Sequence, residues 1–342
     1  MQYRSIFASK QLSMLPKITI ITPSLNQGRY IEQSILSVIE QNYENLEYII
    51  VDGGSTDETL QIIKKYEHKI TKWISEPDLG QTDAINKGLK FATGEVFTWL
   101  NADDYYQPSA LHIMGKAFEI HPNCNVVSAK ANVIAPNGDI TRKTFGVVIH
   151  NDIAKTIGCP VINQPETFFR TRILAQTGHL NICLRYNMDK DLWIKYLILF
   201  GQSNILKINH IVVNFRLHES SKTTAEGHKF TDERDCTMLG MAYWAGLSQE
   251  AIFIEELINM KPIKFDLVLA DKKMVKKAIH YFLLLKADEY YVSGEKKKSR
   301  LCLLFLDKML VIRDWVLYCK LFVRVVIIKA TQSQSSYIHH QL

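Results

Sequence analysis

Acidic and small polar residues follow three apolar runs of the sequence, at the points where these runs end. They occupy positions 52–57, 75–78 and 101–104. If the runs are neighbouring parallel strands, their carboxyl ends meet at one edge of a sheet, where ligands bind in such folds. Carboxylates gathered there repel one another unless a cation compensates them, and Mg²⁺ or Mn²⁺ prefer oxygen ligands. The sequence therefore predicts a divalent cation at this edge, which would bridge the oxygens of a diphosphate and stabilise the charge on a departing nucleoside diphosphate.

Two adjacent glycines in the first of these segments predict a tight turn. Gly53 and Gly54 allow a close approach of the backbone to a ligand or to another segment. The sequence contains neither the GxGxxG pattern nor the GxxxxGK[ST] pattern. This absence disfavours a dinucleotide-dependent dehydrogenase and a P-loop nucleotidase.

The first 130 residues alternate strand-like and helix-like segments. Apolar β-branched runs predict strands, and apolar residues at helical spacing, such as Ile31, Ile35 and Val38, predict helices between them. The predicted strands are 17–22, 46–51, 70–74 and 95–100, and the predicted helices are 30–41, 57–66 and 81–91. This alternation indicates an α/β fold with a Rossmann-like, mainly parallel sheet flanked by helices.

The rest of the chain has a different pattern. Residues 126–135 before Pro136–Asp139 predict a strand and a hairpin turn, 190–200 a buried helix and 205–215 another strand or strand pair. From about 235 the pattern is helical. We expect an N-terminal extension (1–16), a catalytic domain (17–230) and a basic helical C-terminal region (231–342). Within the domain, the change of pattern separates a first half, 17–130, from a second half, 131–230.

Composition and cysteine spacing favour a soluble intracellular enzyme. The chain has 342 residues, 47% of them hydrophobic, which is enough to bury one large core with an appendage. Its six cysteines form no CxxC or CxxH spacing, and no signal peptide precedes the first strand. We expect a cytoplasmic protein without a transmembrane helix, because the uncharged stretches of the tail are too short to span a bilayer.

The basic charge is concentrated near the C-terminus. Residues 261–342 carry 16 Lys and Arg against 7 Asp and Glu, whereas residues 1–260 carry 25 against 28. With Trp315, Tyr318 and Phe322 nearby, this predicts peripheral contact with an anionic membrane at the inner face of the cell membrane, and no nucleic-acid partner. No single apolar face emerges on a helical wheel, because Asp307 and Asp314 interrupt it. A helical pair packed on the catalytic domain, or a homodimer contact, is the alternative.

Seven sequence blocks lie between Lys17 and about Ser221. They read ITIITPSLNQGRYIEQSILSVIEQ, YIIVDGGSTDET, SEPDLGQTDAINKGL, TGEVFTWLNADDYYQPSAL, NQPETFFR, MDKDLWIK and FRLHESSKT. In this order they resemble the inverting glycosyltransferases of family 2, which have the GT-A fold, and together they are specific although each alone is weak. The resemblance implies transfer of a sugar from a nucleotide-sugar donor, with UDP-sugars favoured, to a saccharide or lipid-linked saccharide. It also implies that 17–130 is the nucleotide-sugar half of the domain and 131–230 the acceptor half.

The resemblance also implies which residues bind the donor and the metal. Asp103 takes the place of the metal-binding acid of the family's DXD motif, and Asn101 stands where the family has the first acid, which reduces the negative charge offered to a metal. His218 is a further candidate metal ligand, for which a surface or core role is the alternative. The expected donor-binding residues are Thr22, Pro23, Asp52, Asp83, Asn101 and Arg216.

The block MDKDLWIK implies the catalytic base. Asp189 aligns with the family's base, which would take the proton of the attacking hydroxyl and invert the anomeric centre. Asp191 competes for that role and is otherwise expected near the acceptor, together with Gln164 and Glu166, for which a structural role is the alternative. The alternative for Asp189, as for Asp52, Asp57 and Asp103, is turn or helix-cap chemistry.

Two other functions share the predicted fold. A sugar nucleotidyltransferase needs a glycine-rich loop with a basic residue directly after the first strand, and the loop 23–29 lacks that richness. A nucleotide-sugar-binding homologue without turnover is the alternative from a different class, and the Asn101 departure is what favours it.

Overall fold

The computed structural model describes residues 15–268, 272–311 and 315–327. Within them, nine strands form one mixed sheet in the order β3-β2-β1-β4-β8-β6-β9-β5, with β7 paired to β6. The strands are Ile18–Ser24 (β1), Leu46–Asp52 (β2), Lys72–Ser75 (β3), Val96–Trp99 (β4), Tyr105–Tyr106 (β5), Val126–Ile134 (β6), Ile140–Lys143 (β7), Thr167–Arg170 (β8) and Ile205–Arg216 (β9). Strands β3, β2, β1 and β4 are mutually parallel, whereas β8 is antiparallel to both of its neighbours. The predicted α/β class with a mixed sheet is confirmed.

Helices lie between and after the strands. They are Gly28–Ile39 (α1), Thr59–Lys65 (α2), Gln81–Leu89 (α3), Ala110–Ile120 (α4), Ile153–Gly158 (α5), Leu174–Thr177 (α6), Met188–Phe200 (α7), Lys222–Ala225 (α8), Gly227–Trp244 (α9), Ser248–Ile258 (α10), Lys272–Val292 (α11), Lys296–Phe305 (α12) and Trp315–Phe322 (α13). The hairpin predicted at 136–139 joins β6 to β7, and Gly138 takes the positive φ of 94° that the turn requires. The predicted strand at 205–215 is the single strand β9.

The two faces of the sheet bury separate cores because side chains alternate along each strand. Ile18 and Ile20 of β1 join a core with Ile35 of α1 on one face. Ile21 points to the other face and packs with Ile85 of α3 and with α7. Helices α1 and α3 therefore cover opposite faces and hold the carboxyl ends of β1, β2 and β4 between them.

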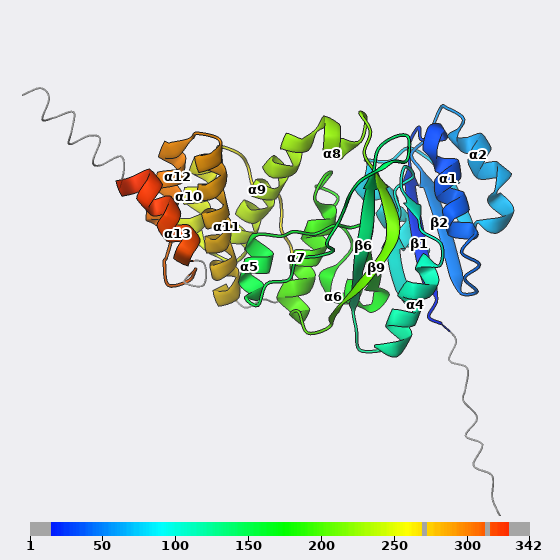
Figure 1. Ribbon diagram of the computed structural model, residues 1–342, viewed down its shortest axis with the longest axis horizontal. Coiled ribbons are helices and arrows are strands. Elements are labelled where there is room, and N and C mark those ends of the chain that lie inside the picture. The colour runs from blue at the N-terminus through cyan, green and yellow to red at the C-terminus, as the bar shows by residue number, and fades with distance from the viewer. Residues whose placement is uncertain (1–14, 269–271, 312–314, 328–342) are drawn as a thin grey trace, which may run out of the picture.

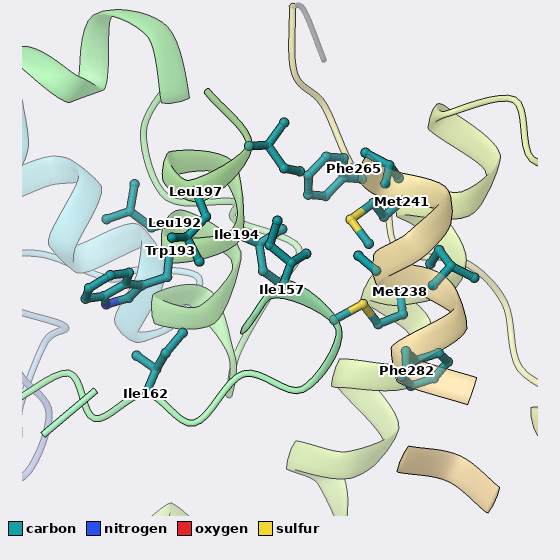
Figure 2. Packing of buried hydrophobic residues seen from close by; sticks show 14 of the residues in the cluster. Ile157, Ile162, Leu192, Trp193, Ile194, Leu197, Met238, Met241, Phe265 and Phe282 are labelled. Atoms are coloured by element: carbon teal, nitrogen blue, oxygen red, sulfur yellow. The ribbon is translucent and has the colours of Figure 1, made fainter. Parts of the chain in front are cut away.

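The second core continues from the sheet into the C-terminal helices. Figure 2 shows Leu192 and Ile194 of α7 on one side of Ile157, and Met238 and Phe282 of α9 and α11 on the other. Gly158 ends α5 so close to α11 that an added Cβ would lie 2.2 Å from the carbonyl oxygen of Ala278. The C-terminal helices thus pack on the catalytic domain, as one of the two sequence alternatives proposed.

Helices α12 and α13 lie at the end of the molecule opposite β2 and α2 (Figure 1). In the described part of the chain, no helix combines the length and the apolar character that crossing a membrane would need. Tyr318 is buried, so it does not present its ring to an interface as the sequence suggested. Asp314, and residues 1–14 of the predicted N-terminal extension, lie outside the described residues.

Candidate functional site

The carboxyl end of β2 continues into a loop that Asp52 holds in place. Its buried carboxylate accepts hydrogen bonds from the backbone amides of Gly54 and Ser55 and from the hydroxyls of Ser55 and Ser75, at 2.5–3.0 Å. The side chain has no exposed surface. This geometry indicates that Asp52 shapes the loop at the end of β2, and its contact with the donor stays a prediction.

The glycines of this loop act as the sequence predicted. A Cβ on Gly53 would lie 2.7 Å from Oδ2 of Asp78, and Gly54 has a φ of 89°. Asp57, at the end of the loop, accepts hydrogen bonds from the backbone amides of Gly28 and Thr59. It therefore joins the start of α1 to the start of α2, which is the capping alternative.

The two predicted metal ligands come together although they are far apart in sequence. Asp103 lies in the turn between β4 and β5, and His218 follows the end of β9. Oδ2 of Asp103 is 3.0 Å from Nε2 of His218, and Nδ1 of His218 is 2.9 Å from the hydroxyl of Ser220. The imidazole also packs on the ring of Tyr30, with ring centroids 4.9 Å apart. These contacts fix the direction in which His218 presents Nε2.

This pair fits a divalent cation that shares its coordination with a ligand. Across the residues described, no three His, Cys, Asp or Glu side chains are grouped closely enough to form a complete protein cage. Mg²⁺ is commonly bound through one or two protein groups and completed by phosphate oxygens and water. An anionic oxygen and a ring nitrogen at 3.0 Å from each other match that arrangement.

Arg216 has a different position from the one expected of a donor-binding residue. Its guanidinium donates to the carbonyl oxygens of Asp103 and Pro136 and to the side chain of Gln33, at 2.6–3.0 Å. The residue is 4% exposed, and its charge lies over the rings of Tyr30 and Tyr105. Three of its five N–H donors bond within the protein, so Arg216 orients the turn that carries Asp103. Its contact with the donor stays a prediction.

The Asn of the NADD segment bonds to a buried acid. Asp104 is 1% exposed and accepts the backbone amide of Arg216 at 2.8 Å and the side-chain amide of Asn101 at 3.3 Å. Burial, and then the neighbouring charge of Asp103, hold the pKa of Asp104 well above its usual range. The side-chain oxygen of Asn101 accepts a hydrogen bond from the side-chain amide of Gln81 at 2.6 Å. Asparagine thus provides both a donor and an acceptor at a place where aspartate would face a second carboxyl group.

The two acids at the start of α7 have different surroundings. Asp189 is partly exposed, and burial raises the pKa of its carboxyl while the charge of Lys190 lowers it. Asp191 is 1% exposed, and its Oδ2 lies 2.8 Å from Nζ of Lys195, which is also buried. Asp191 therefore lies in the interior, which leaves no route to an acceptor and makes Asp189 the candidate base.

The remaining predicted residues lie near the same edge of the sheet. Gln164 is buried and donates to the carbonyl oxygen of Trp99, the last residue of β4, at 2.6 Å. Glu166 is 1% exposed, accepts from Thr144 at 2.9 Å, and has its pKa raised to about 7 by burial. Neither side chain presents a surface to an acceptor, so both are better described as supports of the edge.

Among the predicted donor-binding residues, Asp83 is partly exposed. It accepts the backbone amide of Leu79 at 3.1 Å and lies 3.6 Å from Nζ of Lys87, with its side chain 23% exposed. Thr22 is fully buried beside the hydroxyl of Tyr48, and Pro23 is buried as well. The side chains of Thr22 and Pro23 are thus enclosed by the fold, and their contact with the donor stays a prediction.

Lys222 joins the two halves of the site and was not predicted. Nζ of Lys222, at the start of α8, donates to Oε1 of Gln81 at 2.9 Å and to the carbonyl oxygen of Arg185 at 3.1 Å. Because Gln81 also bonds to Asn101, the segment before α7 is linked to the NADD turn. Lys222 belongs to the block FRLHESSKT, but the sequence does not show which residues its side chain contacts in the folded protein.

The sequence is similar to known glycosyltransferases. Residues 19–183 match the family model of Glycosyl transferase family 2. The chain is 32% identical over 300 residues to an uncharacterized glycosyltransferase of Haemophilus influenzae, covering 82% of this chain and 89% of that protein. It is 25% identical over 314 residues to an uncharacterized glycosyltransferase of Rickettsia typhi, covering 88% of each.

Two solved structures share the fold at low sequence identity. The crystal structure of S. aureus TarS 1–349 in complex with UDP-GlcNAc aligns with a TM-score of 0.53 at 17% identity, covering 78% of this chain and 71% of that one. The chain spans 43% of the longer crystallised TarS chain. The mannosyltransferase PcManGT from Pyrobaculum calidifontis, in complex with GDP-Man and Mn²⁺, aligns with a TM-score of 0.50 at 16% identity, covering 85% of this chain and 74% of that one.

Proposed function

This chain belongs to glycosyltransferase family 2 and is a glycosyltransferase, and from that premise we propose that it inverts the donor sugar in a metal-assisted transfer. The observation that carries this proposal is the pairing of Asp103 with His218 at the carboxyl edge of the sheet. The pair lies beside the loop shaped by Asp52 and the turn that contains Asn101. These are the parts that a nucleoside diphosphate sugar and its cation require.

Asp103 and His218 would hold Mg²⁺ or Mn²⁺. When bound, the cation would neutralise charge that develops on the departing nucleoside diphosphate. The complex of PcManGT with Mn²⁺ supports this choice. Arg216 acts behind the site, because it fixes the backbone of Asp103 through a 3.0 Å hydrogen bond.

The donor is a nucleoside diphosphate sugar, with a UDP-sugar favoured. The TarS complex with UDP-GlcNAc supports a uridine nucleotide, and the PcManGT complex with GDP-Man makes guanosine the alternative that a screen has to include. Asp83 and Asn101 are the predicted donor contacts that remain accessible on the edge of the sheet.

Asp189 is the proposed base. It would accept the proton of the attacking hydroxyl as the new bond forms and the bond from the sugar to the diphosphate breaks. Attack from the side opposite the leaving group inverts the anomeric centre, so an α-linked donor gives a β-linked product. The raised pKa of the carboxyl brings the base closer to neutral pH, where it accepts a proton more readily.

The acceptor is a saccharide or a lipid-linked saccharide, in the assembly of a polysaccharide or glycoconjugate. We place the enzyme at the inner face of the cell membrane, held by α12 and α13. Their exposed faces combine Leu304 and Val316, at 58% and 67% exposure, with exposed lysines and Arg300. A mixed apolar and cationic surface suits an anionic lipid headgroup layer.

A donor screen tests the proposal. Purified protein is heated with UDP-, GDP- and dTDP-sugars, each with Mn²⁺ or with EDTA. A donor present at 100 times its Kd stabilises the protein by about 2.7 kcal/mol. We expect such a shift for one nucleotide class only, and only with metal. A shift of equal size with EDTA for every donor would contradict the metal-assisted proposal.

A further inference from the structure

Glu233 binds the backbone of the segment that leads into the helix of the proposed base. Its buried carboxylate, 8% exposed, accepts hydrogen bonds from the backbone amides of Arg185, Tyr186 and Asn187 at 2.6, 2.8 and 2.6 Å. Hydrogen bonds from neutral donors to an ionised acceptor are stronger than those between neutral groups. A single side chain from α9 therefore fixes three consecutive peptide groups directly before α7.

Two further contacts join the same segment to α9. The side-chain amide of Asn187 donates to the carbonyl oxygen of Phe230 at 2.7 Å, and the hydroxyl of Tyr186 donates to Glu226 at 2.6 Å. Asn187 is the residue that precedes α7, and Asp189 is the second residue of that helix. The direction in which α7 starts, and with it the place of Asp189, is thus set from α9.

Helix α9 is itself fixed to α11. Arg234 forms a two-pronged contact with Glu289 at 2.7 and 2.8 Å, and Lys286 lies 2.6 Å from Asp235. Below these ion pairs, Met238 and Met241 of α9 belong to the core that Figure 2 shows between α7 and α11. A rigid support is what a positioning contact needs, because a carboxylate on a mobile helix would not hold three amides.

We propose that Glu233 is a positioning residue for Asp189, and that the C-terminal helical region thereby forms a working part of the active site. The inference rests on the proposed role of Asp189 as the base. Glu233 does not touch the reacting atoms; it holds the backbone from which the base extends. The C-terminal helices then determine the position of the base relative to the acceptor hydroxyl, in addition to stabilising the fold.

Glu233→Gln is the variant that tests this contact. The amide keeps the shape of the side chain, but its nitrogen cannot accept a hydrogen bond, so the three peptide amides compete for one oxygen. We expect kcat to fall at least about tenfold while the KM for the donor stays unchanged, since a misplaced base affects the chemical step and not donor binding. Asp232→Asn makes the same change of charge at the neighbouring position of α9 and serves as the control.

The pH dependence gives a readout that loss of stability would not imitate. The charged groups that act on Asp189 are Lys190 on its own helix and Glu233 on α9. Arg234 on α9 acts on Lys190, and Nζ of Lys222 on α8 binds the carbonyl oxygen of Arg185. Burial is the main cause of the raised pKa of Asp189, and the negative charge of Glu233 raises it further. In Glu233→Gln, the acid limb of the kcat profile should move to lower pH, because the base then ionises more easily.

Two measurements on the full-length protein decide the proposal. Hydrogen exchange of the amides at 185–187 should become at least about tenfold faster in Glu233→Gln and stay unchanged in Asp232→Asn. In a double-mutant cycle, Asp189→Asn combined with Glu233→Gln should be no slower than Asp189→Asn alone. Additive losses, or exchange rates equal to wild type, would overturn the positioning role. If the wild type transfers no sugar from any donor, the proposed function has failed. The exchange rates then still decide whether Glu233 holds the backbone amides of 185–187.

Discussion

Oδ2 of Asp103 lies 3.0 Å from Nε2 of His218, although the two residues are 115 positions apart in the sequence. The turn after β4 and the end of β9 meet here, and Arg216 fixes this meeting by donating to the carbonyl oxygen of Asp103 at 3.0 Å. In the tautomer that carries its proton on Nε2, His218 donates to the carboxylate. A cation that takes the place of this proton would find both ligands already facing it.

We predict that Asp103→Ala abolishes metal-dependent binding of the donor. The substitution removes the only anionic ligand of the pair, so the cation loses its strongest attachment to the protein. Isothermal titration of the donor with saturating Mn²⁺ measures the effect, and we expect the affinity to fall at least about a hundredfold. Asp139→Ala, in the exposed hairpin turn, should leave the affinity unchanged. If Asp103→Ala binds the donor with wild-type affinity, Asp103 is not a metal ligand.

Asn101→Asp should destabilise the free protein rather than improve it. The amide of Asn101 donates to the buried Asp104 at 3.3 Å, and a carboxylate in its place would bring a second negative charge against that acid. We expect a loss of about 1–3 kcal/mol in urea unfolding, partly recovered by Mn²⁺. Asn137 also donates to an acid, Asp139, but on the exposed turn, so Asn137→Asp should change stability by less than about 0.5 kcal/mol. Equal effects of the two substitutions would show that the burial of Asp104 is irrelevant.

The sequence predicted the first half of the fold well because its signals there are local. The β-branched runs that became β1 and β2 are buried throughout, and the helix predicted at 81–91 is α3. The two-residue strand β5 and the antiparallel β8 were not predicted, because their formation depends on long-range pairing with β9, β4 and β6. Local propensity carries little information about such short strands.

The site residues show the same difference between local signals and long-range contacts. Residue types and order singled out Asp103 and His218, which the fold brings within 3.0 Å of each other, and their role as metal ligands stays a prediction. The burial of Arg216 and Asp52 was not visible, because a polar residue at a strand end looks the same whether it faces a ligand or holds a loop. Lys222 and Glu233 were missed for a related reason: their partners are 141 and about 47 positions away along the chain.

Asp189→Asn and Asp191→Asn should separate catalysis from stability. Asp189→Asn removes the proton acceptor from a partly exposed position, so we expect kcat to fall at least about a hundredfold with unchanged donor binding and unchanged Tm. Asp191→Asn leaves the buried Lys195 without its ion-pair partner, so we expect a lower Tm and a loss of about 3–5 kcal/mol. Steady-state kinetics and thermal melts on both variants make the comparison. The reverse pattern would assign the base to Asp191.

Glu166 should make the protein less stable as the pH rises. Burial raises the pKa of this carboxyl from 4.5 to about 7, so the folded state keeps a proton that the unfolded state has lost. Its contribution is fully present below about pH 4.5 and is lost as the pH rises to about 7, for a total of about 3 kcal/mol. Urea unfolding at pH 5 and pH 8 should show this decline in wild type and in the exposed control Glu40→Gln, and a smaller decline in Glu166→Gln. The same decline in Glu166→Gln would assign it to other groups.

The C-terminal helices should bring the enzyme to anionic vesicles through charge. Leu301 and Leu304 of α12 and Val316 and Val323 after it are exposed by 44–67%, and exposed cations stand beside them. Deleting the tail is not a usable test, because α9 and α11 share the core of α7 (Figure 2). Charge reversal at the surface leaves that core intact.

We therefore predict the outcome of a flotation assay with full-length protein at low salt. Wild type should float with vesicles of phosphatidylserine and phosphatidylcholine and stay behind with phosphatidylcholine alone. A variant with Lys296, Lys297, Arg300 and Lys320 changed to Glu should lose flotation, since each cation near an anionic surface contributes about 1 kcal/mol. The control changes four exposed lysines at other parts of the surface, Lys64, Lys69, Lys90 and Lys143, and should float like wild type. Equal loss in both variants would indicate attraction by net charge alone, and flotation of neither wild type nor control would leave α12 and α13 as a packing or dimer surface.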